Sequence, residues 1–122
     1  MIPLIDETLG DELFGLQADQ ETTQMQQQIW WEVSKSIRPD LENTIGQEPG
    51  NLKANLHRIR GYCSTCAMSR LEKVLLDWES QPAVVEAAER YRSPALEIAL
   101  LSIEAIEARY PHLRQVPANT SQ

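Results

Sequence analysis

The stretch from Leu52 to Cys66 reads LKANLHRIRGYCSTC and places two kinds of residue at helical spacing. The apolar kind recurs every three or four positions, as on one face of an α-helix, at Leu52, Leu56, Ile59, Cys63 and Cys66. The polar or small kind follows the same spacing at Lys53, Ala54, His57, Arg60, Gly61 and Ser64. At about 100° per residue the two stripes lie roughly 140° apart. The stretch therefore predicts a helix that packs on one side and presents His57 to solvent from its middle.

The residues before this stretch predict a second, longer helix. Its apolar positions recur every four residues, and Trp30 lies on the same side: Met25, Ile29, Val33, Ile37, Leu41 and Ile45. Pro39 lies inside the pattern, and we expect it to bend the helix rather than end it, because the apolar stripe continues past it. The segment 46–50 holds two glycines and a proline and breaks the chain. Asn51 is the expected N-cap of the helix that follows.

The residues after Cys66 predict two more main helices. The first has apolar positions at Met68, Leu71, Val74, Leu75 and Trp78. It stops before Pro82, and residues 83–91 form a further short helix at most. Ser93 is expected to cap the last helix, since Pro94 then occupies its first position. The buried stripe of that helix is expected at Leu96, Ala99, Leu100, Ile103 and Ile106, and Tyr110 with Pro111 ends it.

These four helices and their short links predict an all-α protein, an antiparallel up-down four-helix bundle with an extra short N-terminal helix. No stretch shows a convincing run of strict alternation. Residues 1–20 are expected to form a lead-in whose apolar spacing is interrupted by Gly10 and Gly15. Residues 21–112 form the bundle, and residues 113–122 are expected to be a disordered tail.

Length and composition restrict the functional class. A chain of 122 residues suits one domain. The 11 Lys and Arg against 18 Asp and Glu give a net charge of -7, which argues against a nucleic-acid-binding face. No segment has the pattern of a secretory signal or a membrane span, so we expect a cytoplasmic protein. Met1 and the polar tail favour a free-standing protein over a domain cut from a larger kinase, and we expect a monomer. No glycine-rich phosphate cradle is visible, so no ATP-dependent activity of its own is expected.

The surroundings of His57 suit a nucleophile. Lys53 lies four residues before it and Arg60 three residues after it, so both are its neighbours on the helix surface. Two cations favour the neutral imidazole, which has the lone pair that a nucleophile needs. The same cations would balance the charge of a phosphoryl group. Gly61 costs a helix about 1 kcal/mol relative to alanine, which suggests a steric purpose beside the ring, and Ala54 is also small.

The run His57-Arg58-Ile59-Arg60-Gly61 resembles the motif of histidine-containing phosphotransfer (HPt) proteins, His-x-(Leu/Ile)-(Lys/Arg)-Gly. The similarity covers about residues 25–109. It includes the positions Pro39, the turn 46–50, Ala67, Met68, Leu71, Leu75 and the pair Trp78-Glu79. Three residues depart from the family pattern: Arg60 stands where Lys is commoner, Tyr62 where a small residue is usual, and Ala67 where Gly is frequent. The last two could alter the turn after this helix.

The resemblance implies a phosphorelay function. His57 would be phosphorylated on its outer nitrogen, Nε2, Arg60 would balance the phosphate charge, and Gly61 would give clearance. Lys53 is added from the helix geometry and is not part of the short motif. The implied partners are response-regulator receiver domains and a hybrid histidine kinase. The receiver would supply the aspartate, a lysine and Mg²⁺, so the chain would need no cofactor of its own.

Other interpretations remain open at this point. The chain could be an HPt-like adaptor or kinase inhibitor that binds partners without phosphotransfer. Cys63 and Cys66 match the spacing of a redox pair or half a zinc site, but their place on the apolar stripe favours small core residues. His112 follows a helix end, where an interaction with the helix dipole is the plain expectation. Trp31 either covers a neighbouring helix or is an exposed anchor for a partner.

Overall fold

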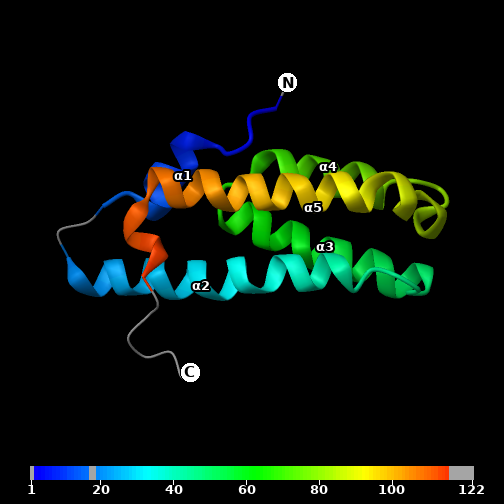
Figure 1. The fold of residues 1–122 in the computed structure, drawn as a ribbon, viewed down its shortest axis with the longest axis horizontal. Helices are drawn as coiled ribbons and strands as arrows, with labels where there is room; N and C mark the ends of the chain where they lie inside the picture. Colours follow the sequence, from blue (N-terminus) through cyan, green and yellow to red (C-terminus); the bar gives the residue numbers. More distant parts are fainter. Residues whose placement is uncertain (1, 17–18, 116–122) are drawn as a thin grey trace.

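The computed structural model describes residues 2–16 and 19–115, and these residues contain five α-helices and no strand. The elements are α1 (Glu7–Phe14), α2 (Gln20–Glu42), α3 (Pro49–Thr65), α4 (Ser69–Glu79), α5 (Val84–Arg109) and a 3₁₀ turn, η1 (Pro111–Arg114). The helices pack as a bundle in which α2 and α5 run the length of the molecule (Figure 1). The short helix α1 lies at the end where α5 finishes and η1 turns back onto α2. No helix among the described residues is long and apolar enough to cross a membrane.

The helix α2 confirms the expectation that Pro39 does not end it, but its buried face differs from the predicted stripe. Val33, Ile37 and Leu41 are buried, whereas Met25 is 59% exposed and Ile45 67% exposed. Each four-residue step turns about 40° around a helix with about 100° per residue. A stripe of such steps therefore leaves the core at both ends.

Two glutamines and a tryptophan take the buried positions in the first half of α2. Gln26 and Gln27 are buried with Trp30, and their amides have partners. The Gln26 Nε2 donates to the carbonyls of Leu13 and Gly15, at 3.0 Å each. A buried amide that is fully hydrogen-bonded is tolerated in a core. These bonds explain why polar residues replace the expected apolar stripe.

The helix α5 is one continuous helix, so the expected short helix at 83–91 and the Ser93 cap are wrong. Pro94 lies in its interior and removes one main-chain donor. The residues before it are nevertheless packed firmly, because Tyr91 stacks on Trp78 with ring centroids 6.2 Å apart. The buried positions continue in helical spacing across the proline: Val84, Ala87, Ala88, Ala95, Ala99, Ser102 and Ile106. Leu100 was expected in this stripe and is exposed.

The helix α3 begins earlier than the sequence indicates. Its N-cap is Glu48 and Pro49 occupies the first turn, so Asn51 is not the cap. Proline suits this position because its missing N–H would have no helical partner there. The turn to α4 contains Ala67 in the left-handed region, with φ of 62°. This left-handed backbone favours glycine, and Ala67 is one of the residues noted above as departures from the HPt pattern.

The ordered chain extends past the expected end of the bundle at residue 112. Leu113 in η1 is buried, so the disordered tail does not begin there. The rest of the expected tail, residues 116–122, lies outside the described residues. At the other end, residues 2–6 run along the turn between α3 and α4, where the Asp6 N–H donates to the Ala67 carbonyl at 2.8 Å. The lead-in is therefore attached to the bundle.

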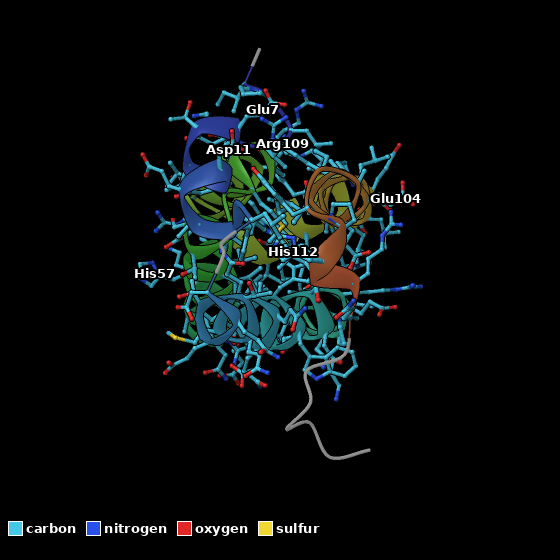
Figure 2. The ribbon with its side chains drawn as sticks, turned by 90° about the vertical axis from the view of Figure 1, so that its left-hand side faces the viewer. Glu7, Asp11, His57, Glu104, Arg109 and His112 are labelled. Carbon is cyan, nitrogen blue, oxygen red and sulfur yellow. The ribbon has the colours of Figure 1, made fainter. Side chains whose placement is uncertain are left out.

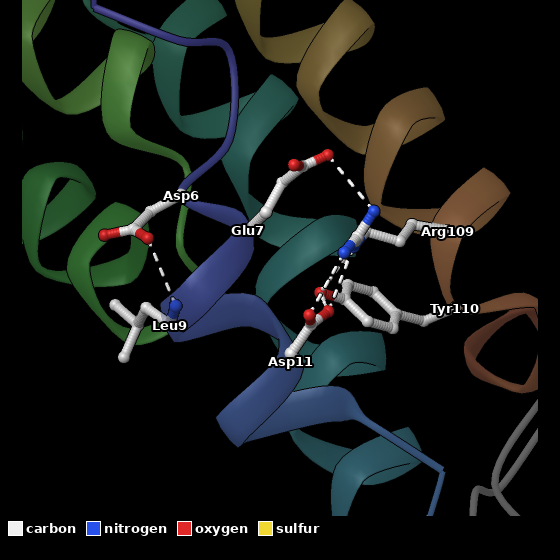
Figure 3. Close-up of polar contacts among 6 residues, drawn as sticks. All are labelled: Asp6, Glu7, Leu9, Asp11, Arg109 and Tyr110. Atoms are coloured by element: carbon white, nitrogen blue, oxygen red, sulfur yellow. Dashed lines mark hydrogen bonds and ion pairs between the residues drawn. The ribbon is translucent and has the colours of Figure 1, made fainter.

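A polar cluster fastens α1 to the end of α5 (Figure 3). The Arg109 guanidinium donates to both carboxylate oxygens of Asp11, at 3.0 Å each, and to Glu7 at 3.1 Å. The Tyr110 hydroxyl donates to Asp11 at 2.6 Å. Gly10 permits this approach, since an added Cβ would lie 2.5 Å from the Tyr110 oxygen. Gly10 is thus part of α1 and does not interrupt it.

We expect Asp11→Asn to lower the melting temperature (Tm) at pH 7. Hydrogen bonds from Arg109 and then Tyr110 hold the pKa of Asp11 below its ordinary value of 3.8. A carboxyl with a lowered folded-state pKa contributes stability above its unfolded pKa and loses it as the pH falls through the folded pKa. The Tm values of wild type and variant should therefore converge below about pH 4. Thermal unfolding from pH 7 to pH 3 checks this, and Glu12→Gln is the neighbouring control. Equal Tm values at pH 7 would contradict it.

The turn between α2 and α3 offers a matched pair of glycine variants. Gly46 has φ of +74°, and Gly50 lies in the first turn of α3, with nothing within 4 Å of an added Cβ at either. Gly46→Ala should lower the free energy of unfolding by about 1–2 kcal/mol, because a left-handed backbone strains alanine. Gly50→Ala should raise it by about 0.5–1 kcal/mol, because alanine favours the helix. Urea unfolding checks the opposite signs, and equal signs would refute this prediction.

Candidate functional site

The side chain of His57 lies on the outer surface of α3, as the sequence predicts. It is 72% exposed and stands at one edge of the molecule in Figure 2. All five residues of the apolar stripe are buried. The polar stripe is exposed at five of its six positions, Lys53, Ala54, His57, Gly61 and Ser64. Its sixth member, Arg60, is half-buried because it leans onto α4.

Arg60 contacts the imidazole and a carboxylate at the same time. Its Nη2 lies 2.9 Å from Nδ1 of His57, and its Nε donates to Oε2 of Glu79 at 3.1 Å. The other carboxylate oxygen of Glu79, Oε1, lies 3.6 Å from the same Nδ1. Arg60 is 24% exposed and Glu79 21% exposed, so both are partly shielded from water. The site is therefore a cluster of three residues, one of them from α4.

Sequence reasoning missed Glu79 as a member of this site. The two helices form an antiparallel hairpin, so residues equally far from the turn face each other. Ser64 and Glu72 lie four residues either side of Met68 and are joined by a hydrogen bond of 2.7 Å. His57 and Glu79 lie eleven residues either side of it. This symmetry about the turn is the signal that could have found Glu79.

The remaining candidate residues leave the ring accessible. Lys53 is exposed and has no ion-pair partner among residues 2–16 and 19–115. Gly61 has nothing within 4 Å of an added Cβ, so the space beside it is open. The guanidinium of Arg58 lies 3.5 Å from the Asp40 carboxylate of α2. Of the three cations near His57, Lys53 has no ion-pair partner among the described residues, whereas Arg58 contacts Asp40 and Arg60 contacts Glu79.

The two cysteines are core residues. Both thiols are buried, as their place on the apolar stripe indicates. Burial raises the pKa of Cys63 well above its usual range, and burial raises the pKa of Cys66 to about 12. The thiolate is the form that reacts with oxidants and metals. A redox or zinc role for the pair therefore lacks support.

The second histidine does not interact with a helix end as expected. The Nε2 of His112 lies 3.0 Å from Oε1 of Gln26, which can only accept, so Nε2 carries a proton. The carbonyl of His112 accepts from Nε2 of Gln27 at 2.9 Å. His112 therefore attaches η1 to α2, and Figure 2 shows it apart from His57. Its role is structural.

No family model, curated protein or solved structure matches this chain. The function is therefore inferred from the chemistry of the site. That site consists of an exposed imidazole in the middle of a bundle helix, a guanidinium in contact with it, a free ammonium one turn away and a carboxylate from the adjacent helix.

Proposed function

We propose that this chain is a histidine phosphotransfer protein of a two-component phosphorelay. His57 accepts a phosphoryl group from the aspartate of one receiver domain and passes it to another. The observation that carries the proposal is the exposed His57 imidazole with the Arg60 guanidinium 2.9 Å from its Nδ1. The finer form of the fold, an antiparallel up-down four-helix bundle of α2 to α5 with α1 added, is part of the same proposal.

The charges around His57 suit a phosphorylated ring. A phosphoryl group on Nε2 adds close to two negative charges and three acceptor oxygens. Lys53 and Arg60 lie one helical turn from His57 on the same face of α3, where they can hydrogen-bond those oxygens. Phosphoryl transfer depends mainly on positioning and charge balance. This chain would supply the nucleophile and the cations, and the receiver would supply the aspartate, the lysine and Mg²⁺.

The surface around the ring suits a protein partner rather than a small substrate. Ala54 and Gly61 flank His57 at helical spacing, and both are exposed. A receiver must bring its phosphorylated aspartate within bonding distance of the ring, which needs such clearance. The partners we propose are receiver domains and the hybrid histidine kinase that charges them. An adaptor function without transfer would need the docking face but not the cluster of Arg60 and Glu79.

The test is phosphoryl transfer from a panel of phosphorylated receiver domains. We expect an acid-labile label on the wild type and none on His57→Gln. His112→Gln is the matched control and should be labelled at the wild-type level, because His112 lies apart from the site. Receivers that bind the folded wild type without labelling it would overturn the proposal in favour of the adaptor.

A further inference from the structure

We propose that Arg60 and Glu79 compete for Nδ1 of His57 and thereby decide which ring nitrogen is free to react. The arrangement observed is a resting state in which Nδ1 accepts from Arg60. In the reactive state Nδ1 carries the proton and its N–H donates a hydrogen bond to Glu79, which leaves the lone pair of Nε2 free. Glu79 is then a positioning residue, and its role rests on the proposed phosphotransfer function.

The contact with Arg60 determines the tautomer of the resting ring. A guanidinium has only donors, so a nitrogen 2.9 Å from Nη2 must accept. A neutral imidazole has one accepting and one donating nitrogen. With Nδ1 accepting, the proton lies on Nε2. The nitrogen without a protein partner among the described residues is therefore protonated and cannot attack phosphorus.

Glu79 provides the alternative partner. Its Oε1 lies 3.6 Å from Nδ1, just beyond a hydrogen bond, so a small rotation brings the two atoms into contact. Its Oε2 remains bonded to Nε of Arg60 at 3.1 Å, which keeps the carboxylate beside the ring. A carboxylate can accept an N–H that a guanidinium cannot. Moving Arg60 away from Nδ1 therefore favours the tautomer with the proton on Nδ1.

Electrostatic attraction to the incoming phosphoryl group draws Arg60 away from Nδ1 of His57. The phosphoryl oxygens attract the guanidinium more strongly than a neutral ring nitrogen does. In the reactive tautomer the Nε2 lone pair forms the N–P bond while the P–O bond of the aspartyl phosphate breaks. The aspartate leaves as a carboxylate, and no proton has to leave the ring. The product is an imidazolium that retains its Nδ1 proton and faces the negative charge of Glu79.

The tautomer can be measured without any phosphorylation, by ¹⁵N NMR of the His57 ring at a pH where it is neutral. We expect Nε2 protonated and Nδ1 unprotonated in the wild type. Arg60→Leu should reverse the assignment, because Glu79 then has no competitor. Arg58→Leu removes the same charge from the same helix but contacts Asp40, so it should leave the ring unchanged. A wild-type ring already protonated on Nδ1, or one that ignores Arg60→Leu, would overturn the proposal.

The second measurement is the rate of transfer from a receiver that labels the wild type. Glu79→Gln should lower this rate roughly 10-fold, because its amide NH2 can donate to Nδ1 and hold the unreactive tautomer, and Glu79→Leu, which removes the acceptor, should lower it similarly. The corresponding Asp-to-Asn change in a Ser-His-Asp triad costs about 10⁴-fold, because it gives the wrong histidine tautomer. We expect a smaller effect of the Glu79 variants because the His57 ring is exposed, so that water can move the proton between its two nitrogens.

The two measurements separate the inference from the function. Reversal of the tautomer in Arg60→Leu without labelling of the wild type by any receiver would leave the competition intact and overturn the phosphotransfer function. Labelling of the wild type, with transfer at the wild-type rate in both Glu79→Leu and Glu79→Gln, would support the function and overturn the role of Glu79.

Discussion

Gly61→Leu is expected to lower the rate of phosphoryl transfer from a receiver domain by at least about 10²-fold. Gly61 lies four residues after His57 and therefore next to it on the helix surface. Nothing lies within 4 Å of an added Cβ, so the chain itself accepts a side chain there. A docked receiver is not expected to tolerate this side chain, because leucine would stand between the receiver and the His57 ring. A misplacement of about 1 Å between reacting groups can cost this much.

The stability of Gly61→Leu tests whether a loss of transfer could be caused by unfolding. A glycine within a helix costs about 1 kcal/mol relative to alanine or leucine, so Gly61→Leu should unfold at higher urea concentration than the wild type. Gly61→Ala is the intermediate case, with the same gain in stability and a smaller loss of transfer.

A small phosphodonor separates docking from chemistry at this position. Phosphoramidate needs no docking surface, so it should label His57 equally fast in the wild type and in Gly61→Leu. Unchanged transfer from the receiver in Gly61→Leu would mean that the partner approaches His57 from another side.

Trp78→Ala is expected to lower the free energy of unfolding by about 3–5 kcal/mol. The indole is fully buried and stacks on Tyr91 with centroids 6.2 Å apart. Its Nε1 donates to the carbonyl of Val84 at 3.0 Å, at the start of α5. Truncation would leave a cavity and remove this buried hydrogen bond, and both changes are destabilising. Urea unfolding measures the loss.

Trp31→Ala is the matched control for this prediction. Trp31 is half-buried on α2, where Lys35 lies 5.3 Å from its ring centroid. Removal of a partly exposed ring should cost about 1 kcal/mol or less. Similar losses for the two variants would contradict the role of Trp78 as the packing centre between α4 and α5.

The local parts of this fold could be predicted because they depend on residues close in the chain. The two faces of α3 follow from a spacing of three and four residues, and the exposure of His57 and the burial of Cys63 follow from the same periodicity. The position of Arg60 beside the ring is likewise a property of one helix. The break at 46–50 was visible from its glycines and proline, although the N-cap of α3 lies three residues before the expected one.

The errors concern residues whose environment is set by distant segments. Met25 belongs to an apolar pattern, yet Gln26 is buried because carbonyls at the end of α1 need its amide. Pro94 resembles the start of a helix, yet α5 continues through it because α4 holds the preceding turns through Trp78 and Tyr91. In both cases the free energy of tertiary contacts exceeds a local preference of about 1–3 kcal/mol.

The sequence by itself determined the helical class, the exposure of His57 and its neighbours on one helix face, because helical periodicity orders side chains without reference to the rest of the chain. Only the tertiary structure decided that Glu79 lies beside the ring. That placement depends on how α3 and α4 cross, which the left-handed turn at Ala67 and the buried side chains between the helices determine together. The carboxylate that would control the tautomer of His57 is thus a product of packing between helices.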